Sequence, residues 1–483
     1  MGAVPWWLVL SSTGCRYAEG IHLPAEKHTP PETSWSQNPP ILQALAISLK
    51  EAFMMPSELA LRGGTPVVPE GAVRSWPPLT QADREAVLAV FDSNELHGTH
   101  APRARALEER WAAYIGTKYA LVANSGTATL HMAIAAAGIG PGDEVITSAF
   151  TYWSTAAAVL HNNAIPVFVD IDPLTYTIDP ALIEERITDR TRALLPVHIH
   201  GMPADMDLIM AIARRHGLVV IGDCCQAHGA TYKGVKVGKI EDMGCFSCNR
   251  SKNLSGGEGG LFTTDNEDYW RHADMLRQFG EVILPDRPRE YNAYALGWMY
   301  RPHEFVNAFI LSQLDRLDEY NAVRRQLAGY LTTALEEIPG FAGPYTPDYA
   351  DPCYFTYVVE FRPHELGLDV PVLEFRQAME QALAAEGVHM HQWQRMPVPA
   401  QDVFQRRVGY GRGCPWTCPF GRGDVYYDPA EYPRTWQFLE SHSYLPGVYP
   451  PNDLSLMKLY VDAFAKVSEN ATAVLDLYRR RAQ

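Results

Sequence analysis

Three short stretches of the chain carry residue types that could act together in catalysis. In ANSGTATL an apolar run passes through Ser125, Gly126 and Thr127 into a predicted helix. In IGDCCQAHGATYKG, Asp223 ends another apolar run, and FSCNRSKNLSGGEGG contains Lys252 beside a run of glycines. Free N–H groups at a helix start can hold a phosphate, and a carboxylate at a buried strand end needs a partner. The set therefore offers a phosphate site, a carboxylate and an amine.

These groups match the needs of pyridoxal phosphate, which requires a lysine for its Schiff base, an acid beside its ring nitrogen and a phosphate site. An aromatic ring above the cofactor would complete the site, and SAFTYWST supplies Tyr152 and Trp153. Each feature alone also has a structural explanation: a turn before a helix, an N-cap or ion pair, a surface lysine, a core aromatic. The prediction rests on their combination.

The elements that must position these residues follow from the hydrophobic pattern. Between residues 119 and 265, apolar runs alternate with amphipathic stretches such as TATLHMAIAAAG and MDLIMAIARRHG, which read as helices. The runs are YALVANS, EVITSA, IPVFVDI, RALLPVHIH, LVVIGDCC, MGCFSCN and GGLFTTD. Near-continuous apolarity predicts strands covered on both faces, hence a large, mostly parallel, doubly wound α/β sheet. The last two runs leave no room for a crossover helix, so one of that pair is expected to be antiparallel. Ligands gather beyond the carboxyl ends of such strands.

The length of 483 residues indicates more than one domain. We expect a long helical stretch after Arg301 to lead from the large PLP-binding domain into a smaller C-terminal α+β domain. A segment rich in Gly, Pro and aromatic residues in that second domain is expected to be a functional loop or lid. The predicted divisions are an N-terminal extension at 1–54, the large domain at 55–320, the small domain at 321–483 and the insertion at about 397–450.

Composition narrows the class of protein. The proline-rich N-terminal extension is predicted to be disordered or an artefact of the start codon, with Met54 or Met55 as the alternative start. A formal net charge of -15 argues against nucleic acid and anionic membranes as partners. The eight cysteines are sparse and indicate a reduced, cytoplasmic protein. No metal site is predicted, although Cys414 and Cys418 leave zinc as a weaker alternative to free thiols.

From about residue 60 onward the chain resembles the DegT/DnrJ/EryC1/StrS family of sugar and cyclitol aminotransferases. Six motifs carry the resemblance in family order: NSGTATL, GDEVITSAFTYWST, PVFVDIDPLTYTIDP, LPVHIHGMPADMD, DCCQAHGATYKG and FSCNRSKNLSGGEGG. The resemblance implies a fold-type-I, PLP-dependent enzyme that works as a homodimer with shared active sites.

The resemblance also implies roles for individual residues. Lys252 matches the Schiff-base lysine, Asp223 the partner of the pyridinium nitrogen, and Gln226 the residue beside the ring hydroxyl. Tyr152 matches the stacking aromatic more closely than Trp153. The expected phosphate ligands are Gly126, Thr127 and Ser247, and the expected substrate contacts are His228, Tyr300 and Arg301.

The implied reaction moves an amino group from glutamate or glutamine to a ring ketone, as in antibiotic and other secondary-metabolite biosynthesis. FSC before the lysine resembles inosose aminotransferases and RPHEF resembles aminohydroxybenzoate synthases, which favours a keto-cyclitol or related carbocycle. A nucleotide-linked keto sugar is the second possible acceptor. A PLP-dependent dehydratase or a non-catalytic partner protein would share this fold. The lysine disfavours a dehydratase, since related dehydratases carry histidine at that position, and a partner protein would need neither the lysine nor the aspartate.

Two departures from the family pattern concern the neighbouring subunit and the substrate. LGWMYRPHEF places Met299 where the family has an asparagine that reaches the phosphate across the dimer. Because a thioether cannot donate a hydrogen bond, another residue must supply that contact. The segment GYGRGCPWTCPFGRGD has no counterpart in the simplest members, and we expect it to shape the acceptor pocket.

Overall fold

The computed structural model describes residues 58–96, 98, 101–284 and 286–482. The predicted N-terminal extension, residues 1–54, lies outside this described part of the chain. Among the described helices, none has the length and apolarity needed to cross a bilayer.

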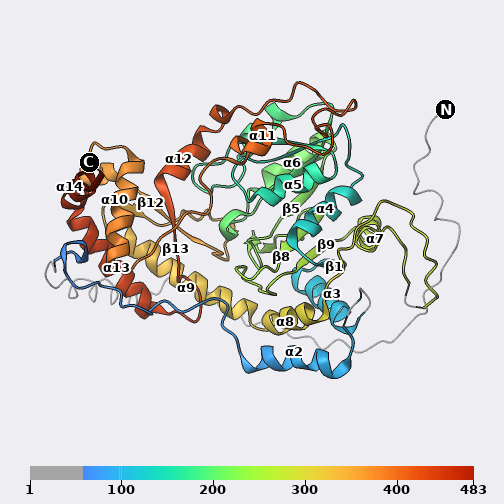
Figure 1. Ribbon diagram of the computed structural model, residues 1–483, viewed down its shortest axis with the longest axis horizontal. Coiled ribbons are helices and arrows are strands. Elements are labelled where there is room, and N and C mark those ends of the chain that lie inside the picture. Colours follow the sequence, from blue (N-terminus) through green and yellow to red (C-terminus); the bar gives the residue numbers. More distant parts are fainter. Residues whose placement is uncertain (1–57, 97, 99–100, 285, 483) are drawn as a thin grey trace. The chain divides into compact units, whose positions relative to one another are not determined.

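A seven-stranded sheet with the order β1-β9-β8-β5-β4-β2-β3 forms the centre of the fold (Figure 1). All seven predicted apolar runs supply a strand, and β9 alone of these strands runs against its two neighbours. This confirms the expected antiparallel pair and the mostly parallel sheet. The strands are β1 (Tyr119–Ala123), β2 (Glu144–Ser148), β3 (Ile165–Val169), β4 (Thr191–Leu195), β5 (Val219–Asp223), β8 (Met243–Ser247) and β9 (Gly260–Thr264).

Helices cover both faces of this sheet. Successive side chains of β1 point to opposite faces, so Leu121 packs with α4, α5 and α7 while Val122 packs with α3 and α8. Further along, Val220 of β5 packs against α6 on the second face. The helices are α2 (Gln81–Ser93), α3 (Pro102–Ile115), α4 (Gly126–Ala136), α5 (Trp153–His161), α6 (Met206–His216), α7 (Glu267–Leu276) and α8 (Glu304–Leu314).

The two helices predicted from TATLHMAIAAAG and MDLIMAIARRHG are α4 and α6. The Ser125 hydroxyl caps α4 by accepting from the Ala128 N–H, and the Asp205 carboxylate caps α6. Both helices lie where the sequence predicted them. Helix α6 is amphipathic as expected, whereas α4 is buried on almost every side.

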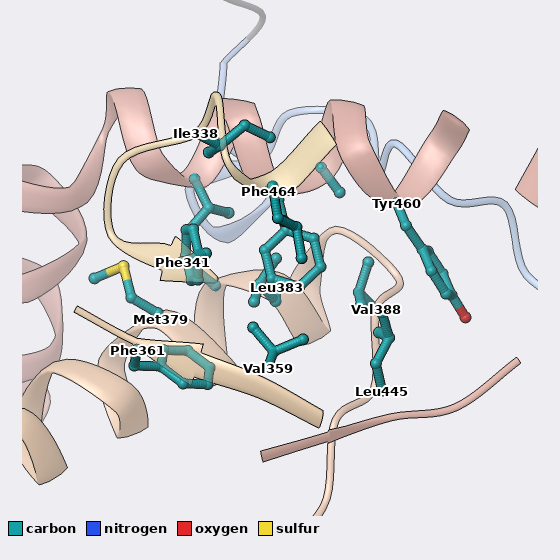
Figure 2. Close-up of a cluster of buried hydrophobic side chains, with 14 of the residues drawn as sticks. Ile338, Phe341, Val359, Phe361, Met379, Leu383, Val388, Leu445, Tyr460 and Phe464 are labelled. Atoms are coloured by element: carbon teal, nitrogen blue, oxygen red, sulfur yellow. The ribbon is translucent and has the colours of Figure 1, made fainter. Parts of the chain in front are cut away.

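A second core lies against the small antiparallel sheet β10-β12-β13 (Figure 2). It buries aromatic and aliphatic side chains including Phe341, Phe361 and Phe464, and it also takes in Leu59 and Val68 from the start of the described chain. The predicted boundary at residue 320 falls inside α9. The elements are α9 (Leu317–Leu335), β10 (Phe341–Ala342), β12 (Tyr357–Phe361), α10 (Val372–Ala385), β13 (His442–Leu445), α13 (Leu454–Glu469) and α14 (Ala471–Ala482).

Two stretches differ from their predicted form. The helical stretch after Arg301 is broken between α8 and α9 at Asp315 and Arg316. The predicted irregular insertion contains α11 (Asp402–Gln405) and, toward its end, α12 (Pro433–Ser441) and β13. A third small sheet joins β11 (Ala350–Asp351), β6 (Thr231–Tyr232) and β7 (Val235–Lys236).

A buried ion pair supports the sheet below the site. The Arg277 side chain is 1% exposed; its Nη1 lies 2.6 Å from Glu108 Oε1 and donates to the Val122 carbonyl of β1. Arg277→Met leaves the Glu108 carboxylate without its partner, so we expect a loss of about 3–5 kcal/mol in the free energy of unfolding. Urea unfolding measures this loss. Arg110→Met, which breaks an exposed pair with Asp315, should cost under about 1 kcal/mol, and equal losses would contradict the buried-pair argument.

Candidate active site

The three stretches with candidate site residues meet at the carboxyl edge of the sheet, around Gly260. This glycine pairs with Ala123 at the end of β1 and with Ser247 at the end of β8. A Cβ atom at Gly260 would lie 2.2 Å from the Ser125 carbonyl oxygen. Glycine therefore allows the turn before α4 and the end of β8 to lie side by side.

The predicted phosphate ligands lie together at the start of α4. A Cβ atom at Gly126 would lie 2.6 Å from Ser247 Cβ and 3.0 Å from Cys225 Sγ. The Thr127 hydroxyl donates to the Ser154 hydroxyl over 3.0 Å, which brings the start of α5 to the same place. Helix N–H groups beside hydroxyls fit a phosphate group.

Asp223 is the last residue of β5, and both of its carboxylate oxygens accept hydrogen bonds. The Thr155 hydroxyl donates to its Oδ2 over 2.7 Å, and the Cys225 N–H donates to its Oδ1 over 3.1 Å. Gln226 is fixed in a similar way, because its Oε1 accepts the His200 N–H over 2.8 Å. The amide NH2 of Gln226 is thus left as the donor end.

Lys252 lies in the turn between β8 and β9. Its Nζ lies 4.3 Å from the centre of the Phe355 ring, and its carbonyl accepts the Trp76 indole N–H over 3.0 Å. Burial lowers the pKa of Lys252, while nearby Cys225 and Asp223 act in the opposite direction. A lowered pKa favours the neutral, nucleophilic amine.

The two aromatic candidates have different surroundings. Tyr152 is 59% exposed at the start of α5. Trp153 packs edge-on against Phe404, with ring centres 5.9 Å apart, in a buried cluster. Of the two, Tyr152 is the ring available to a ligand, in agreement with the choice made from the motif.

The three expected substrate contacts, His228, Tyr300 and Arg301, have different surroundings. His228 is fully buried between Trp111 and Phe246, and burial lowers its pKa to about 3. Its burial argues against a substrate contact. The Tyr300 hydroxyl lies 2.9 Å from His131 Nδ1.

Arg301 and Met299 belong to a segment with several exposed apolar side chains. The Arg301 guanidinium lies 5.2 Å from the centre of the Phe279 ring. Arg301 also lines a surface hollow together with Arg105 and Arg289. Met299 is 52% exposed.

The sequence did not single out Thr155, Trp76 or Phe355. Thr155 stands four residues after Thr151 in the SAFTYWST motif, in the first turn of α5. That position could have marked it in the sequence as a residue that faces the site. Trp76 and Phe355 come from segments far from the motifs, and no local pattern marks them.

The segment GYGRGCPWTCPFGRGD makes its contacts at the opposite edge of the sheet. Tyr410 bonds His161 at the end of α5, and the Phe420 carbonyl accepts from Arg190 Nη1 over 2.6 Å. Arg422 lies 3.5 Å from Glu144, the first residue of β2. Within this chain the segment therefore does not line the carboxyl edge where an acceptor pocket was expected.

One group in the described chain combines three potential metal ligands, His198, Cys224 and Glu241, all buried. His198 Nδ1 accepts the Ala204 N–H over 3.1 Å, so Nε2 carries the proton that faces Glu241 Oε1 at 2.7 Å. Since a metal would need that nitrogen unprotonated, the group is a satisfied hydrogen-bond network.

The doubly wound sheet and the groups at its carboxyl edge together are those of a PLP-binding α/β enzyme. The DegT/DnrJ/EryC1/StrS aminotransferase family matches residues 77–419, and the chain belongs to this family. It is therefore a PLP-dependent aminotransferase, as the motifs indicated.

Relatives and solved structures agree with this membership. The chain is 37% identical to L-glutamine:scyllo-inosose aminotransferase of Streptomyces griseus over 351 residues, which is 70% of this chain and 82% of the relative. It is 36% identical to spore coat polysaccharide biosynthesis protein SpsC of Bacillus subtilis over 350 residues, 70% and 86% of the two chains. The crystal structure of S. venezuelae DesV in complex with a ketimine intermediate superposes with a TM-score of 0.68 at 30% identity, covering 80% and 94% of the two chains.

The close packing at Gly126 gives a test of the phosphate site. In Gly126→Ala the new methyl group must push Ser247 away, so we expect a loss of about 1–3 kcal/mol in unfolding free energy together with weaker binding of pyridoxal phosphate. Fluorescence titration of the cofactor-free protein measures the binding. Gly329→Ala is the control: it lies inside α9 with nothing within 4 Å of its added Cβ, so it should gain about 0.5–1 kcal/mol and bind normally. Normal cofactor affinity in Gly126→Ala would place the phosphate elsewhere.

Proposed function

We propose that this aminotransferase moves the amino group of glutamine, or of glutamate, to the ketone of a free carbocycle such as a keto-cyclitol. The main observation that supports this proposal is that Gly126, Asp223, Ser247 and Lys252 lie at one edge of the sheet. The acceptor class is supported by the similarity to the Streptomyces griseus enzyme, whose name includes scyllo-inosose. The free thiols of the described cysteines fit a reducing compartment such as the cytoplasm.

When bound, pyridoxal phosphate supplies an electron sink for the transfer. Lys252 would hold it covalently through Nζ and, once released, would carry a proton between the nitrogen-bearing carbon of the substrate and the cofactor. The lowered pKa of Lys252 suits both roles, because the amine must be neutral to attack and to accept a proton. The Phe355 ring beside Nζ would stabilise the ammonium group that forms when Lys252 takes up the proton.

Asp223 would keep the ring nitrogen protonated. The bonds from Thr155 and Cys225 orient its oxygens before the cofactor arrives, so no reorganisation is needed when the charge pair forms. Gln226 would donate its amide N–H to the ring hydroxyl, since its carbonyl end already accepts from His200. Tyr152 would stack on the ring.

A nucleotide-linked keto sugar is the second candidate acceptor, because a polysaccharide biosynthesis protein is almost as similar to this chain as the inosose enzyme. The two acceptors differ in the phosphates and base of the nucleotide. Product analysis therefore separates them directly.

The functional assay combines L-glutamine with a panel of keto-cyclitols and nucleotide keto sugars, and it detects aminated products by mass. We expect amination of a keto-cyclitol, and a fall of at least about 10²–10⁴-fold in Lys252→Ala. Borohydride should fix the cofactor to the peptide that contains Lys252. Lys239→Ala, a lysine paired with Asp265, is the matched control and should stay active.

Each other outcome has a definite meaning. Amination of nucleotide sugars alone would show that the proposed acceptor is wrong and that the proposed reaction, amino transfer, is right. Loss of water from the substrate without amination would make the enzyme a dehydratase. Trapping of the cofactor on Lys239 would show that the lysine is wrongly assigned.

We also propose that the enzyme is a homodimer in which each chain completes the active site of the other. Exposed apolar side chains gather in the segment from Phe279 to Met299, including Leu296 at 92% exposure, and such a cluster marks an interaction surface. Arg301 follows this segment and lines a hollow together with Arg105, Arg289 and Glu95, and we propose that its guanidinium there binds a phosphate or carboxylate of the partner. Tyr300 is the weaker candidate because its hydroxyl already contacts His131.

Subunit mixing tests the shared site. Lys252→Ala and Arg301→Ala chains are each expected to be folded and inactive, whereas a mixture that exchanges subunits should recover part of the activity. One of the two sites in a hybrid dimer then holds both intact residues. Proven exchange without any recovery, or a single species of monomer mass in solution, would overturn this arrangement.

A further inference from the structure

A buried arginine on α9 lies behind the lysine turn. Arg324 is 1% exposed, and its guanidinium lies 4.4 Å from the centre of the Trp76 ring and 5.4 Å from that of Tyr449. Within the described part of the chain its Nε is buried without a hydrogen-bond partner. Burial lowers the pKa of Arg324 to about 10. Since burying a cation is costly, the two aromatic rings are its main compensation.

One connection runs from Arg324 to the backbone of Lys252. Trp76, on which the guanidinium lies, donates its indole N–H to the Lys252 carbonyl over 3.0 Å. The indole is thus held between the arginine and the lysine turn. Removing the arginine would take away one of the groups that hold this ring, which also packs edge-on against Tyr320 and Tyr449.

A second connection runs to the side chain of Lys252. Arg324 Nη1 donates to the Tyr354 carbonyl over 3.2 Å, and the next residue, Phe355, places its ring 4.3 Å from Lys252 Nζ. Arg324 therefore contacts both the group that holds the lysine backbone and the segment that supports its amine.

A neighbouring asparagine on the same helix strengthens this arrangement. Asn321 precedes Arg324 by three residues, so both side chains lie on one face of α9. Asn253, which follows the lysine, donates to Asn321 Oδ1 and to the Cys353 carbonyl, each over 2.9 Å. The face of α9 thus holds the lysine turn and the segment 353–355 together.

We propose that Arg324 is a positioning residue that sets the place of Lys252 through Trp76 and Phe355. The inference rests on the proposed role of Lys252 as the cofactor-binding lysine. That role requires a fixed backbone and a side chain that can detach and still reach the reacting carbons. Holding the lysine carbonyl through Trp76 and supporting the amine by the face of Phe355 meets both needs.

The readout is the pKa of Lys252, which a purely structural residue would leave unchanged. The titratable groups facing this amine are Asp223, Cys225 and His228, and none of them is altered in the variants. In the full-length, cofactor-free protein, labelling with acetic anhydride at a series of pH values reports the pKa of Lys252 by peptide mass. In the loaded enzyme, the pH dependence of the visible absorption reports a different quantity, the pKa of the nitrogen that links Lys252 to the cofactor, and it shows whether that linkage has moved.

Two variants should raise the pKa of Lys252 toward its ordinary value, because the amine gains water as its supports loosen. They are Arg324→Met, and Trp76→Phe, which keeps a ring for the arginine but removes the indole donor. Both should lower kcat about 10- to 100-fold with KM within about twofold. Arg324→Lys should behave much like Arg324→Met in both the Lys252 pKa and kcat, since an ammonium cannot contact the Trp76 ring and the Tyr354 carbonyl in the same fork geometry.

Arg325→Met is the matched control. Arg325 is the next residue on α9, and it pairs with Asp351 at 2.6 Å and donates to the Pro352 carbonyl over 3.0 Å; its loss should lower thermal stability without moving the pKa of Lys252. Folded Arg324→Met and Trp76→Phe with unchanged Lys252 pKa and kcat would overturn the proposal. If Arg324→Met does not fold, Trp76→Phe alone decides. Failure of borohydride to trap the cofactor on Lys252 would instead count against the proposed function, since the labelling needs no cofactor.

Discussion

The approach of Gly260 to the backbone of Ser125 is the contact on which the candidate site depends. Strand β9 enters the sheet between β1 and β8, and its first residue pairs with the ends of both. With no side chain at Gly260, the turn before α4 can cross that point, where any Cβ would collide with a carbonyl oxygen. The phosphate cradle and the lysine turn are therefore neighbours because one strand is reversed and begins with glycine.

Two polar side chains of the candidate site are hydrogen-bonded before any ligand binds. Asp223 accepts from Thr155 and a backbone N–H, and Gln226 accepts from the backbone of His200. These bonds fix both carboxylate oxygens of Asp223 and the amide oxygen of Gln226. Preorganised groups of this kind stabilise developing charge without having to rearrange during the reaction.

The Gly- and Pro-rich insertion packs against an edge of the central sheet. Strand β3 is an edge strand, and an uncovered edge presents unpaired backbone groups. The Tyr427 hydroxyl donates to the Pro166 carbonyl of that strand over 3.0 Å, while Phe404 and Trp416 pack on its outer side. The segment thus covers an edge of the sheet, and its aromatic residues build a small core of their own.

The sequence by itself determined the strands, the order of motifs and the family, because near-continuous apolar runs and glycine turns are local signals; the residues of the cofactor site remain a prediction from the same motifs. It also favoured Tyr152 over Trp153, a choice that their exposure supports. Only the tertiary structure decided the surroundings of Lys252, since Trp76 and Arg324 lie 176 and 72 residues from it in the chain. The burial of His228, the break before α9 and the place of the insertion likewise depend on packing between distant segments, which leaves no periodic trace in the sequence. Contacts of that kind arise only when the chain has folded.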